Sequence, residues 1–315
     1  MGAPGALRTL NTPDTLDTLD TLDTLDVRRY LDRLRTDHSG RPSLDGLRAL
    51  HRAHVETVPY ETLDFQLGRS TPIDPASSVA RILKGRGGYC LHLNAAFGRL
   101  LTALGYEVTW HRGGVHLDGS MPAPGANANH LTLTVAVDGA TWMADVGLGD
   151  ALYEPLPLRA GSYRQGPFRY RLGPSQAAPG GWRLDHHENG KFVGMDFAPE
   201  PAVPRQFLAQ HRWMSTSPAS VFVRIASVYR RDATGVDGMC GCVLSRIDGT
   251  GVHEVAELTT AGEWFDALAS VFGLTLDDLD ARDRARLWMW LARSHETRLR
   301  MRAEAERERA LSGAR

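Results

Sequence analysis

The spacing of apolar residues changes once along this 315-residue chain, near Gly105. Before that point apolar residues recur every three or four positions, which predicts amphipathic helices. These helices are expected to begin near Asp26, after Ser43, at Pro75 and at Cys90. After that point apolar and polar residues alternate over 106–110 and 131–137, as in strands with one buried face. The pattern therefore predicts an α+β fold in which helices precede an antiparallel sheet.

An Asp-Gly pair at 138–139 predicts a tight turn and hence a β-hairpin. A two-residue turn places Thr132 opposite Asp145, so that Asp145 shares a face with His130, one diagonal step away. Backbones across such a step lie roughly 7–8 Å apart, within reach of side chains. A register shift of one residue would turn Asp145 to the other face, so the expected contact depends on the turn type.

The charge balance argues against polyanionic partners. The 36 Lys and Arg residues nearly match 37 Asp and Glu residues, for a formal net charge of −1, so we expect neither nucleic acid nor a membrane surface as a partner. No stretch approaches the roughly 20 uninterrupted apolar residues of a membrane span. The first residues lack the apolar core of a signal peptide, and we expect a cytoplasmic protein.

Four Thr-Leu-Asp repeats occupy residues 15–26. Their three-residue period fits neither a strand nor an ordinary helix and supplies too few apolar residues for a core. We therefore expect residues 1–26 to form a flexible extension. Between about 150 and 230, short runs rich in Gly, Pro and aromatic residues are typical of a small antiparallel sheet or barrel.

Cys90 is the strongest candidate for a nucleophile. The count of three cysteines is odd, which argues against a disulfide framework and draws attention to a reactive thiol. Cys90 opens a predicted helix, where unpaired N–H groups and the helix dipole favour a thiolate. A buried structural cysteine is, from position alone, an equally good interpretation.

His130 is the best candidate for a base beside that thiol. It begins the alternating strand, and Asp145 on the same face could hold its tautomer and stabilise its cation. His92 is nearer to Cys90 in sequence, but two positions along a helix point it to roughly the opposite side.

Two other groups could bind a metal but are better explained otherwise, and we expect no bound metal. His51 and His54 lie one helical turn apart without further ligands nearby, which favours packing. Cys240 and Cys242 lack the second pair of a zinc site. The His pair at 186–187 is a further candidate for the base; it adjoins charged residues and is predicted to be solvated surface.

The segments around these residues resemble the arylamine N-acetyltransferase family. Its hallmark, Arg-Gly-Gly-aromatic-Cys, is present at 86–90. Further family-like segments stand in the right order: His-x-x-His running into Val-Pro-aromatic-Glu over 51–63, His130 with its strand, Asp-Val-Gly-Leu-Gly at 145–149, and Ser-Thr-Ser-Pro at 215–218 with Phe222.

The resemblance implies a helical first domain, a central antiparallel β-barrel and a C-terminal α/β lid, around a cysteine triad related to those of transglutaminases and papain-like proteases. In this chain the helical domain would span 27–105 and the barrel 106–225. The lid would span 226–315, and the dense Arg and Glu residues of its tail, 298–309, predict a solvated, charged C-terminal helix or a frayed end.

The resemblance also implies a reaction. Cys90 would be the nucleophile, His130 the base and Asp145 the group that orients it. Acetyl-CoA would be the co-substrate, and an arylamine, hydroxyarylamine or hydrazine would accept the acetyl group from a Cys90 thioester in a ping-pong mechanism.

Seven other residues take roles from the family's pattern or their place near it. Three are expected to bind substrate, two are candidates for contacts with CoA, and two form a structural ion pair. Tyr60, Leu148 and Phe222 are the expected substrate-binding residues. Ser215 and Thr216 are the candidates for CoA contacts, and Glu61 and Arg86 form the structural pair.

Three positions depart from the family's usual residues: His92, Leu148 and Thr62. They leave the triad untouched but alter the expected acceptor pocket. The alternative function is therefore that of the related amide synthases, which would join a carrier-bound polyketide chain to an aryl amine and would need a carrier protein as partner. A non-catalytic binding module is the third interpretation.

Overall fold

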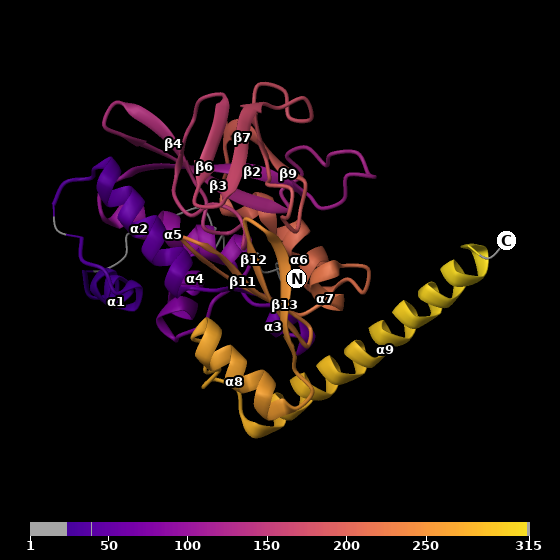
Figure 1. Ribbon diagram of the computed structural model, residues 1–315. Helices are drawn as coiled ribbons and strands as arrows, with labels where there is room; N and C mark the ends of the chain where they lie inside the picture. Colours follow the sequence, from indigo (N-terminus) through magenta and orange to yellow (C-terminus); the bar gives the residue numbers. More distant parts are fainter. Residues whose placement is uncertain (1–23, 39, 314–315) are drawn as a thin grey trace, which may run out of the picture.

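The computed structural model describes residues 24–38 and 40–313 (Figure 1). Most of the extension expected over 1–26 lies outside these residues, but Thr24 to Asp26 are already helical, so the first helix begins before the expected boundary. The helical part contains α1 (Thr24–Leu34), α2 (Leu44–Thr57), α3 (Leu63–Gln66), α4 (Pro75–Leu83) and α5 (Cys90–Ala103). No described helix combines the length and apolar character that crossing a bilayer requires.

Local capping chemistry sets the starts of α2 and α4. The Ser43 side chain accepts a hydrogen bond from the Gly46 N–H (3.1 Å), and the Asp74 carboxylate accepts one from the Ser77 N–H (2.9 Å). These bonds satisfy N–H groups that a helix leaves unpaired. Both predicted helix starts are thereby confirmed.

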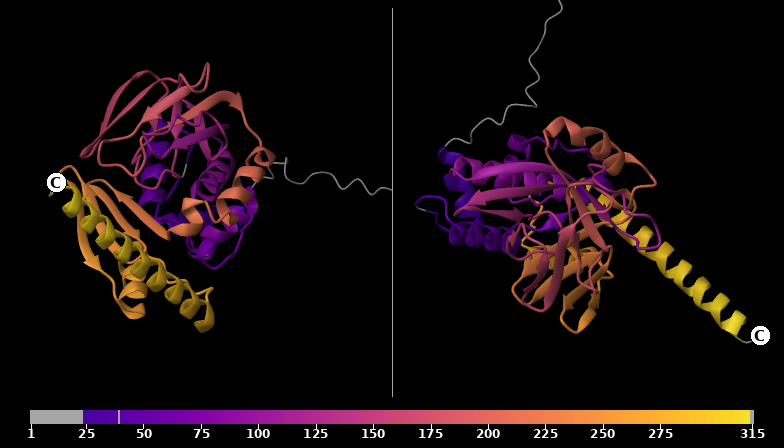
Figure 2. Two further views of the ribbon diagram at one scale, coloured as in Figure 1. Left: turned by 90° about the vertical axis from the view of Figure 1, so that its right-hand side faces the viewer. Right: turned by 90° about the horizontal axis from the view of Figure 1, so that it is seen from above.

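Eight antiparallel strands follow and curl into a nearly closed barrel, in the order β5-β4-β3-β2-β9-β8-β7-β6 (Figures 1 and 2). They are β2 (Glu107–His116), β3 (His130–Val137), β4 (Ala140–Ala144), β5 (Leu156–Pro157), β6 (Gly161–Gln165), β7 (Phe168–Pro174), β8 (Trp182–Asp185) and β9 (Gly194–Pro201). The predicted antiparallel barrel and the α+β class are confirmed.

A second, five-stranded sheet has the order β1-β10-β11-β12-β13. Its first strand, β1, comes from the helical part and pairs with β10. The sheet therefore joins the C-terminal strands to the region before Cys90 by backbone hydrogen bonds. These strands are β1 (Tyr60–Glu61), β10 (Ser227–Asp232), β11 (Gly235–Cys240), β12 (Val243–Asp248) and β13 (Gly251–Glu257). The chain reaches this sheet through η1 (Pro204–Phe207), α6 (Leu208–Thr216) and α7 (Val221–Arg224).

The described part of the chain closes with two helices, α8 (Ala261–Phe272) and α9 (Ala281–Gly313). Trp264, Leu268 and Phe272 of α8 are buried in one core with Leu287 and Leu291 of α9. In Figure 1 and the right-hand view of Figure 2, the far end of α9 projects away from the sheets. This charged end matches the solvated helix expected from its Arg and Glu residues.

Helix α5 is held by the main core. Its side chains Leu93, Phe97 and Leu100 are fully buried in the same cluster as Leu133 and Val135 of β3. Burying each such side chain stabilises the fold by about 1.5–3 kcal/mol. The packing therefore fixes the N-terminal end of α5 relative to the barrel strand that begins at His130.

The hairpin has the predicted register. Val137 pairs with Ala140 and Leu133 with Ala144. Asp138 and Gly139 have φ angles of 50° and 73°, the left-handed conformation that both central residues of a type I′ turn need. The prediction that Asp145 shares a face with His130 rests on this turn, and the turn is confirmed.

The turn generates a stability prediction. A Cβ added at Gly139 would meet nothing within 4 Å, so Gly139→Ala introduces backbone strain without a steric clash. We expect the free energy of unfolding, measured in urea, to fall by about 1–2 kcal/mol. Gly173→Ala is the matched control, because Gly173 also has open space but is not among the positive-φ residues. Equal stability of the two variants would contradict the strain argument.

Candidate active site

Cys90 is the first residue of α5 and follows a loop that only glycine allows. A Cβ on Gly87 would lie 1.9 Å from the carbonyl oxygen of Pro59. The close approach lets the Glu61 N–H donate to the Gly88 carbonyl at 2.9 Å, which aligns the loop with β1. The Cys90 thiol then lies 3.6 Å from the carbonyl oxygen of Asn129, the residue before His130.

His130 and Asp145 form a buried pair. The distance from His130 Nε2 to Asp145 Oδ2 is 2.7 Å, and both side chains are almost completely excluded from solvent. Because Nε2 faces the carboxylate, Nδ1 is the ring nitrogen left for Cys90. The structure thus brings Cys90, His130 and Asp145 together from α5, β3 and the end of the hairpin.

The pair shifts both of its pKa values. Burial disfavours the imidazolium, but the Asp145 charge and hydrogen bond, with a smaller contribution from Cys90, outweigh it and raise the pKa of His130 to about 10. Burial likewise opposes the carboxylate, yet His130 holds the pKa of Asp145 below its ordinary value. The arrangement favours an imidazolium beside the thiol, as a thiolate nucleophile requires.

Asn94 was not predicted as a site residue, yet it anchors Asp145. Its Nδ2 donates to Asp145 Oδ1 (2.8 Å) and to the Leu131 carbonyl (2.6 Å), while its Oδ1 accepts from the Val146 N–H (2.9 Å). The Gly147 N–H also donates to Asp145 Oδ1, at 2.9 Å. The available sequence signal was a polar residue inside the apolar stripe of α5, one turn after Cys90.

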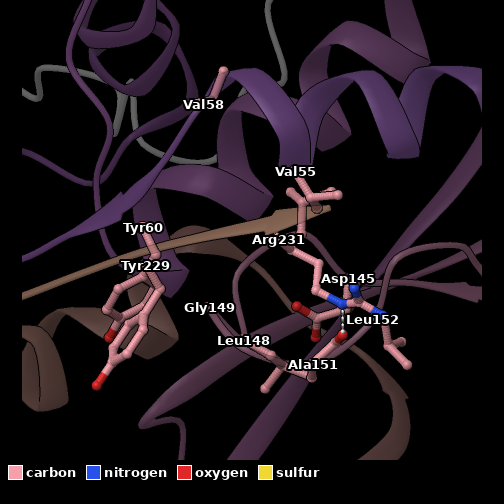
Figure 3. A pocket seen from close by; sticks show the side chains of 11 residues that line it. Val55, Val58, Tyr60, Asp145, Leu148, Gly149, Ala151, Leu152, Tyr229 and Arg231 are labelled. Carbon is pink, nitrogen blue, oxygen red and sulfur yellow. Dashed lines mark hydrogen bonds between the residues drawn. The ribbon is translucent and has the colours of Figure 1, made fainter. Parts of the chain in front are cut away.

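A cavity of about 440 Å³ opens onto Cys90 and His130. All three residues predicted to bind substrate, Tyr60, Leu148 and Phe222, line it. Further aromatic side chains in its wall are Phe192, Trp213 and Tyr229. Figure 3 shows the adjoining pocket, where Tyr60 and Tyr229 lie side by side with ring centroids 6.0 Å apart.

The structure does not bring the two predicted CoA contacts, Ser215 and Thr216, to this cavity. Ser215 is buried with its hydroxyl 3.2 Å from that of Ser70, and the Thr216 hydroxyl donates to the Arg212 carbonyl at 2.7 Å. Each hydroxyl therefore already has a hydrogen-bond partner, Ser70 for Ser215 and the α6 backbone for Thr216. The same helix presents Trp213 to the cavity instead.

Glu61 and Arg86 lie in a buried charge network. Arg86 Nη2 is 3.0 Å from Glu61 Oε1 and 3.2 Å from Asp64 Oδ2, and Arg81 also contacts both carboxylates. Burial opposes the Glu61 charge, but the two guanidinium groups lower the pKa of Glu61 to about 2. The network ties the loop before Cys90 to β1 and makes no contact with the thiol.

The helical histidines His51, His54 and His92 are packed inside the protein. His51 contacts the carbonyls of Tyr153 and Asp145, and His54 contacts the Tyr30 hydroxyl, so the packing interpretation holds for both. His92 Nε2 lies 3.0 Å from the Thr71 hydroxyl, and the Tyr89 and His211 rings pack against the His92 ring.

The three cysteines have free thiols. Cys240 lines the cavity, whereas Cys242 is buried in the C-terminal core. The prediction that 186–187 are solvated surface is wrong. His186 stacks on Phe192 and His187 on Phe168, with ring centroids 4.0 and 3.9 Å apart, and this stacking draws both rings inside.

The Asn94 contacts generate a prediction. Asn94→Ala leaves the Val146 N–H without its acceptor and removes a donor from Asp145, so we expect the free energy of unfolding to fall by about 2–4 kcal/mol. Misplacement of Asp145 should also lower kcat/KM by up to about 10²-fold. Urea unfolding and steady-state assays with acetyl-CoA and an arylamine measure the two effects.

Thr102→Ala is the control on the same helix. Its exposed hydroxyl donates only to the Gly98 carbonyl (2.9 Å), so the change should alter stability by no more than about 0.5 kcal/mol. If Asn94→Ala matches this control in both measurements, Asn94 does not hold Asp145.

Comparisons with known proteins agree with this geometry. A model of the N-acetyltransferase family matches residues 43–281. The chain is 33% identical over 267 residues to the arylamine N-acetyltransferase of Mycolicibacterium smegmatis, covering 81% of this chain and 94% of that protein. It is 38% identical over 165 residues to the arylamine N-acetyltransferase / N-hydroxyarylamine O-acetyltransferase of Salmonella typhimurium, covering 51% of this chain and 57% of the relative.

Two further relatives bear on the chemistry. Proansamycin X synthase of Amycolatopsis mediterranei is 33% identical over 151 residues, which cover 46% of this chain and 57% of that protein. The solved structure of Mycobacterium marinum arylamine N-acetyltransferase in complex with CoA matches with a TM-score of 0.76 at 25% identity, covering 85% of this chain and 99% of that chain. Since the family match spans most of the sequence, this chain belongs to the arylamine N-acetyltransferase family.

Proposed function

We propose that this protein transfers an acetyl group from acetyl-CoA to an arylamine, hydroxyarylamine or hydrazine. The observation that carries the proposal is the buried His130–Asp145 pair beside Cys90, at the mouth of a cavity with aromatic walls. The CoA complex of the Mycobacterium marinum relative supports CoA as the carrier of the donor.

The first half-reaction acylates Cys90. Its thiolate attacks the acetyl carbonyl carbon, the new carbon–sulfur bond forms, and the bond to the CoA sulfur breaks. His130, held as an imidazolium by Asp145, donates its proton to the departing CoA thiolate. N–H groups of the first turn of α5 are the expected donors to the carbonyl oxygen.

The second half-reaction transfers the acetyl group. The neutral imidazole of His130 takes a proton from the acceptor amine as its nitrogen attacks the thioester carbon. The bond to Cys90 Sγ then breaks and the thiolate–imidazolium pair is restored. One residue thus serves as acid in the first step and base in the second.

The cavity favours a small aromatic acceptor. Its volume of about 440 Å³ lies near the lower end of the range for small-molecule sites. Tyr60, Phe222 and Trp213 offer ring faces and edges to an aryl group. We infer that these side chains orient the acceptor so that its amine faces the Cys90 thioester.

The second candidate function is amide synthesis from a carrier-bound polyketide chain. The similarity to proansamycin X synthase favours it, and Leu148 lines the cavity at a position where the family usually has Phe. The cavity volume argues against it, because a long acyl chain needs more enclosed space than acetyl. A carrier protein would be the additional partner. The cytoplasmic location expected from composition stays a prediction.

A donor assay separates the two functions. Mixing the protein with acetyl-CoA and no amine should release close to one CoA per active site in a burst, followed by slow hydrolysis. An aminobenzoate or hydrazide should restore turnover with parallel double-reciprocal lines. Mass spectrometry should find one acetyl group on the Cys90 peptide, and Cys90→Ala should abolish both signals.

Cys242→Ala is the control, because its thiol lies in the C-terminal core and outside the cavity lining. A burst that persists in the Cys90→Ala protein would remove Cys90 from its role. If the unsubstituted protein shows neither burst nor acetylated peptide, the amide-synthase function takes precedence, since its donor site would be shaped for a long chain.

The role of Asp145 predicts a change in pH dependence. Asp145→Asn should fold but lower the acylation rate by several powers of ten, on the order of 10⁴ in comparable triads. Without the carboxylate the pKa of His130 falls, and at neutral pH the thiol loses its imidazolium partner. Alkylation of Cys90 by iodoacetamide should then rise between about pH 7 and 9 in the variant, as it does for ordinary thiols. Alkylation rates with the same pH profile in both proteins would overturn this role.

A further inference from the structure

Asp150, His186 and His187 form a second titratable cluster in the barrel wall. Asp150 comes two residues after Leu148, and the histidines begin the loop between β8 and β9. One ligand-type atom from each residue lies within 4.8 Å of the others. The Asp150 and His187 residues are 2% and 8% exposed, and the His186 side chain is fully buried. The acyl-transfer mechanism uses none of the three.

The imidazoles of His186 and His187 lack well-formed hydrogen bonds. Among the described residues, neither ring nitrogen of His186 or of His187 has a hydrogen-bond partner of ordinary geometry. Each ring nitrogen of an imidazole is a donor or an acceptor, so four buried polar atoms lack a well-formed hydrogen bond. Burying such groups unpaired is unfavourable and calls for an explanation, of which a bound ion is one.

The separations within the cluster are also compatible with a bound metal ion. His186 Nε2 lies 3.2 Å from Asp150 Oδ1. Zinc bonds to nitrogen and oxygen measure about 2.0–2.2 Å, so two ligand atoms of one tetrahedral ion lie roughly 3.3 Å apart. The other separations lie within 4.8 Å, so the His187 ring would have to turn toward the ion on binding.

The carboxylate is already oriented for this role. The Lys191 N–H donates to Asp150 Oδ2 at 2.7 Å, which leaves Oδ1 toward His186. Support of this kind from a neighbouring donor is a common feature of metal ligands. Gly190 lets the loop close over the site, since a Cβ there would lie 2.0 Å from His186 Cδ2.

The buried guanidinium of Arg231 does not occupy the cluster. The Arg231 guanidinium lies over the Phe168 ring, 4.7 Å from its centroid, and that ring also stacks on His187. Its N–H groups donate to backbone carbonyls, including those of Ala151 and Gly235, both at 3.0 Å. These contacts hold the guanidinium outside the Asp150–His186–His187 cluster.

We propose that Asp150, His186 and His187 bind a divalent transition-metal ion of the zinc class. Two imidazoles and one carboxylate suit such ions, whereas Mg²⁺ and Ca²⁺ prefer oxygen ligands alone. Asp150 also borders the cavity, so a water from that side supplies the fourth ligand. The bound ion ties the loop after β8 to the segment after β4 and so stiffens the cavity wall. The site is independent of the Cys90 chemistry.

Cobalt(II) is the probe, in full-length Cys90→Ala protein freed of metal with a chelator. Removing Cys90 excludes the catalytic thiol as a ligand, and a thiolate-to-cobalt charge-transfer band would reveal binding by Cys240 or Cys242. We expect one Co²⁺ per chain with visible absorption and no such band. Zn²⁺ should displace the Co²⁺, and Mg²⁺ should not.

His186→Gln and His187→Gln should each weaken binding at least about 10-fold, as loss of a ligand does. His253→Gln is the matched control, because His253 Nε2 also lies 3.2 Å from a carboxylate oxygen, of Asp248, but on the surface. Circular dichroism and thermal melting check that each variant folds. Should either cluster variant unfold, Gly190→Ala replaces it, since the added methyl displaces the His186 ring.

Binding that weakens in the cluster variants and not in His253→Gln supports the site. The absence of stoichiometric Co²⁺ binding, or equal binding in every folded variant, overturns it and leaves an Asp–His pair without a metal. A thiolate band that accounts for all of the bound cobalt overturns it as well.

Discussion

The buried carboxylate of Asp145 is the interaction on which the site depends. It accepts hydrogen bonds from His130, Asn94 and the Gly147 N–H, and these donors come from the barrel, from α5 and from the segment after the hairpin. An ionised carboxylate can be buried only when its oxygens are satisfied in this way. Satisfying it therefore forces the helical part and the barrel into one relative position, and that position puts Cys90 beside His130.

A second buried network does the same for the other side of Cys90. Arg86 and Arg81 hold Glu61 and Asp64, so the loop before Cys90 cannot leave β1 without exposing or unpairing charges. Breaking one partner of such a network is strongly destabilising, because the remaining charge stays buried. The ion pairs thus hold the loop that precedes Cys90, and the packing of α5 holds the segment that follows it.

Burial alone does not decide how a histidine titrates here. His51, His92 and His130 are all buried, yet burial lowers the pKa of His51 to about 4 and that of His92 to about 3. His130 shifts the other way because it alone of the three faces a carboxylate side chain at hydrogen-bond distance, 2.7 Å. His130, beside Cys90 in space, is therefore the basic imidazole, and His51 and His92 stay neutral.

The sequence by itself determined what local chemistry controls. Capping at Ser43, the glycine loop before Cys90 and the turn at 138–139 act within a few residues, so helix starts and hairpin register, and with them the contact between His130 and Asp145, could be predicted. Only the tertiary structure decided which distant groups meet. Asn94 reaching Asp145, and the inward stacking of the pair at 186–187, depend on aromatic and polar partners far away in the chain. Local sequence patterns do not reveal such partners, because the burial of a polar side chain depends on the distant residues that pack against it.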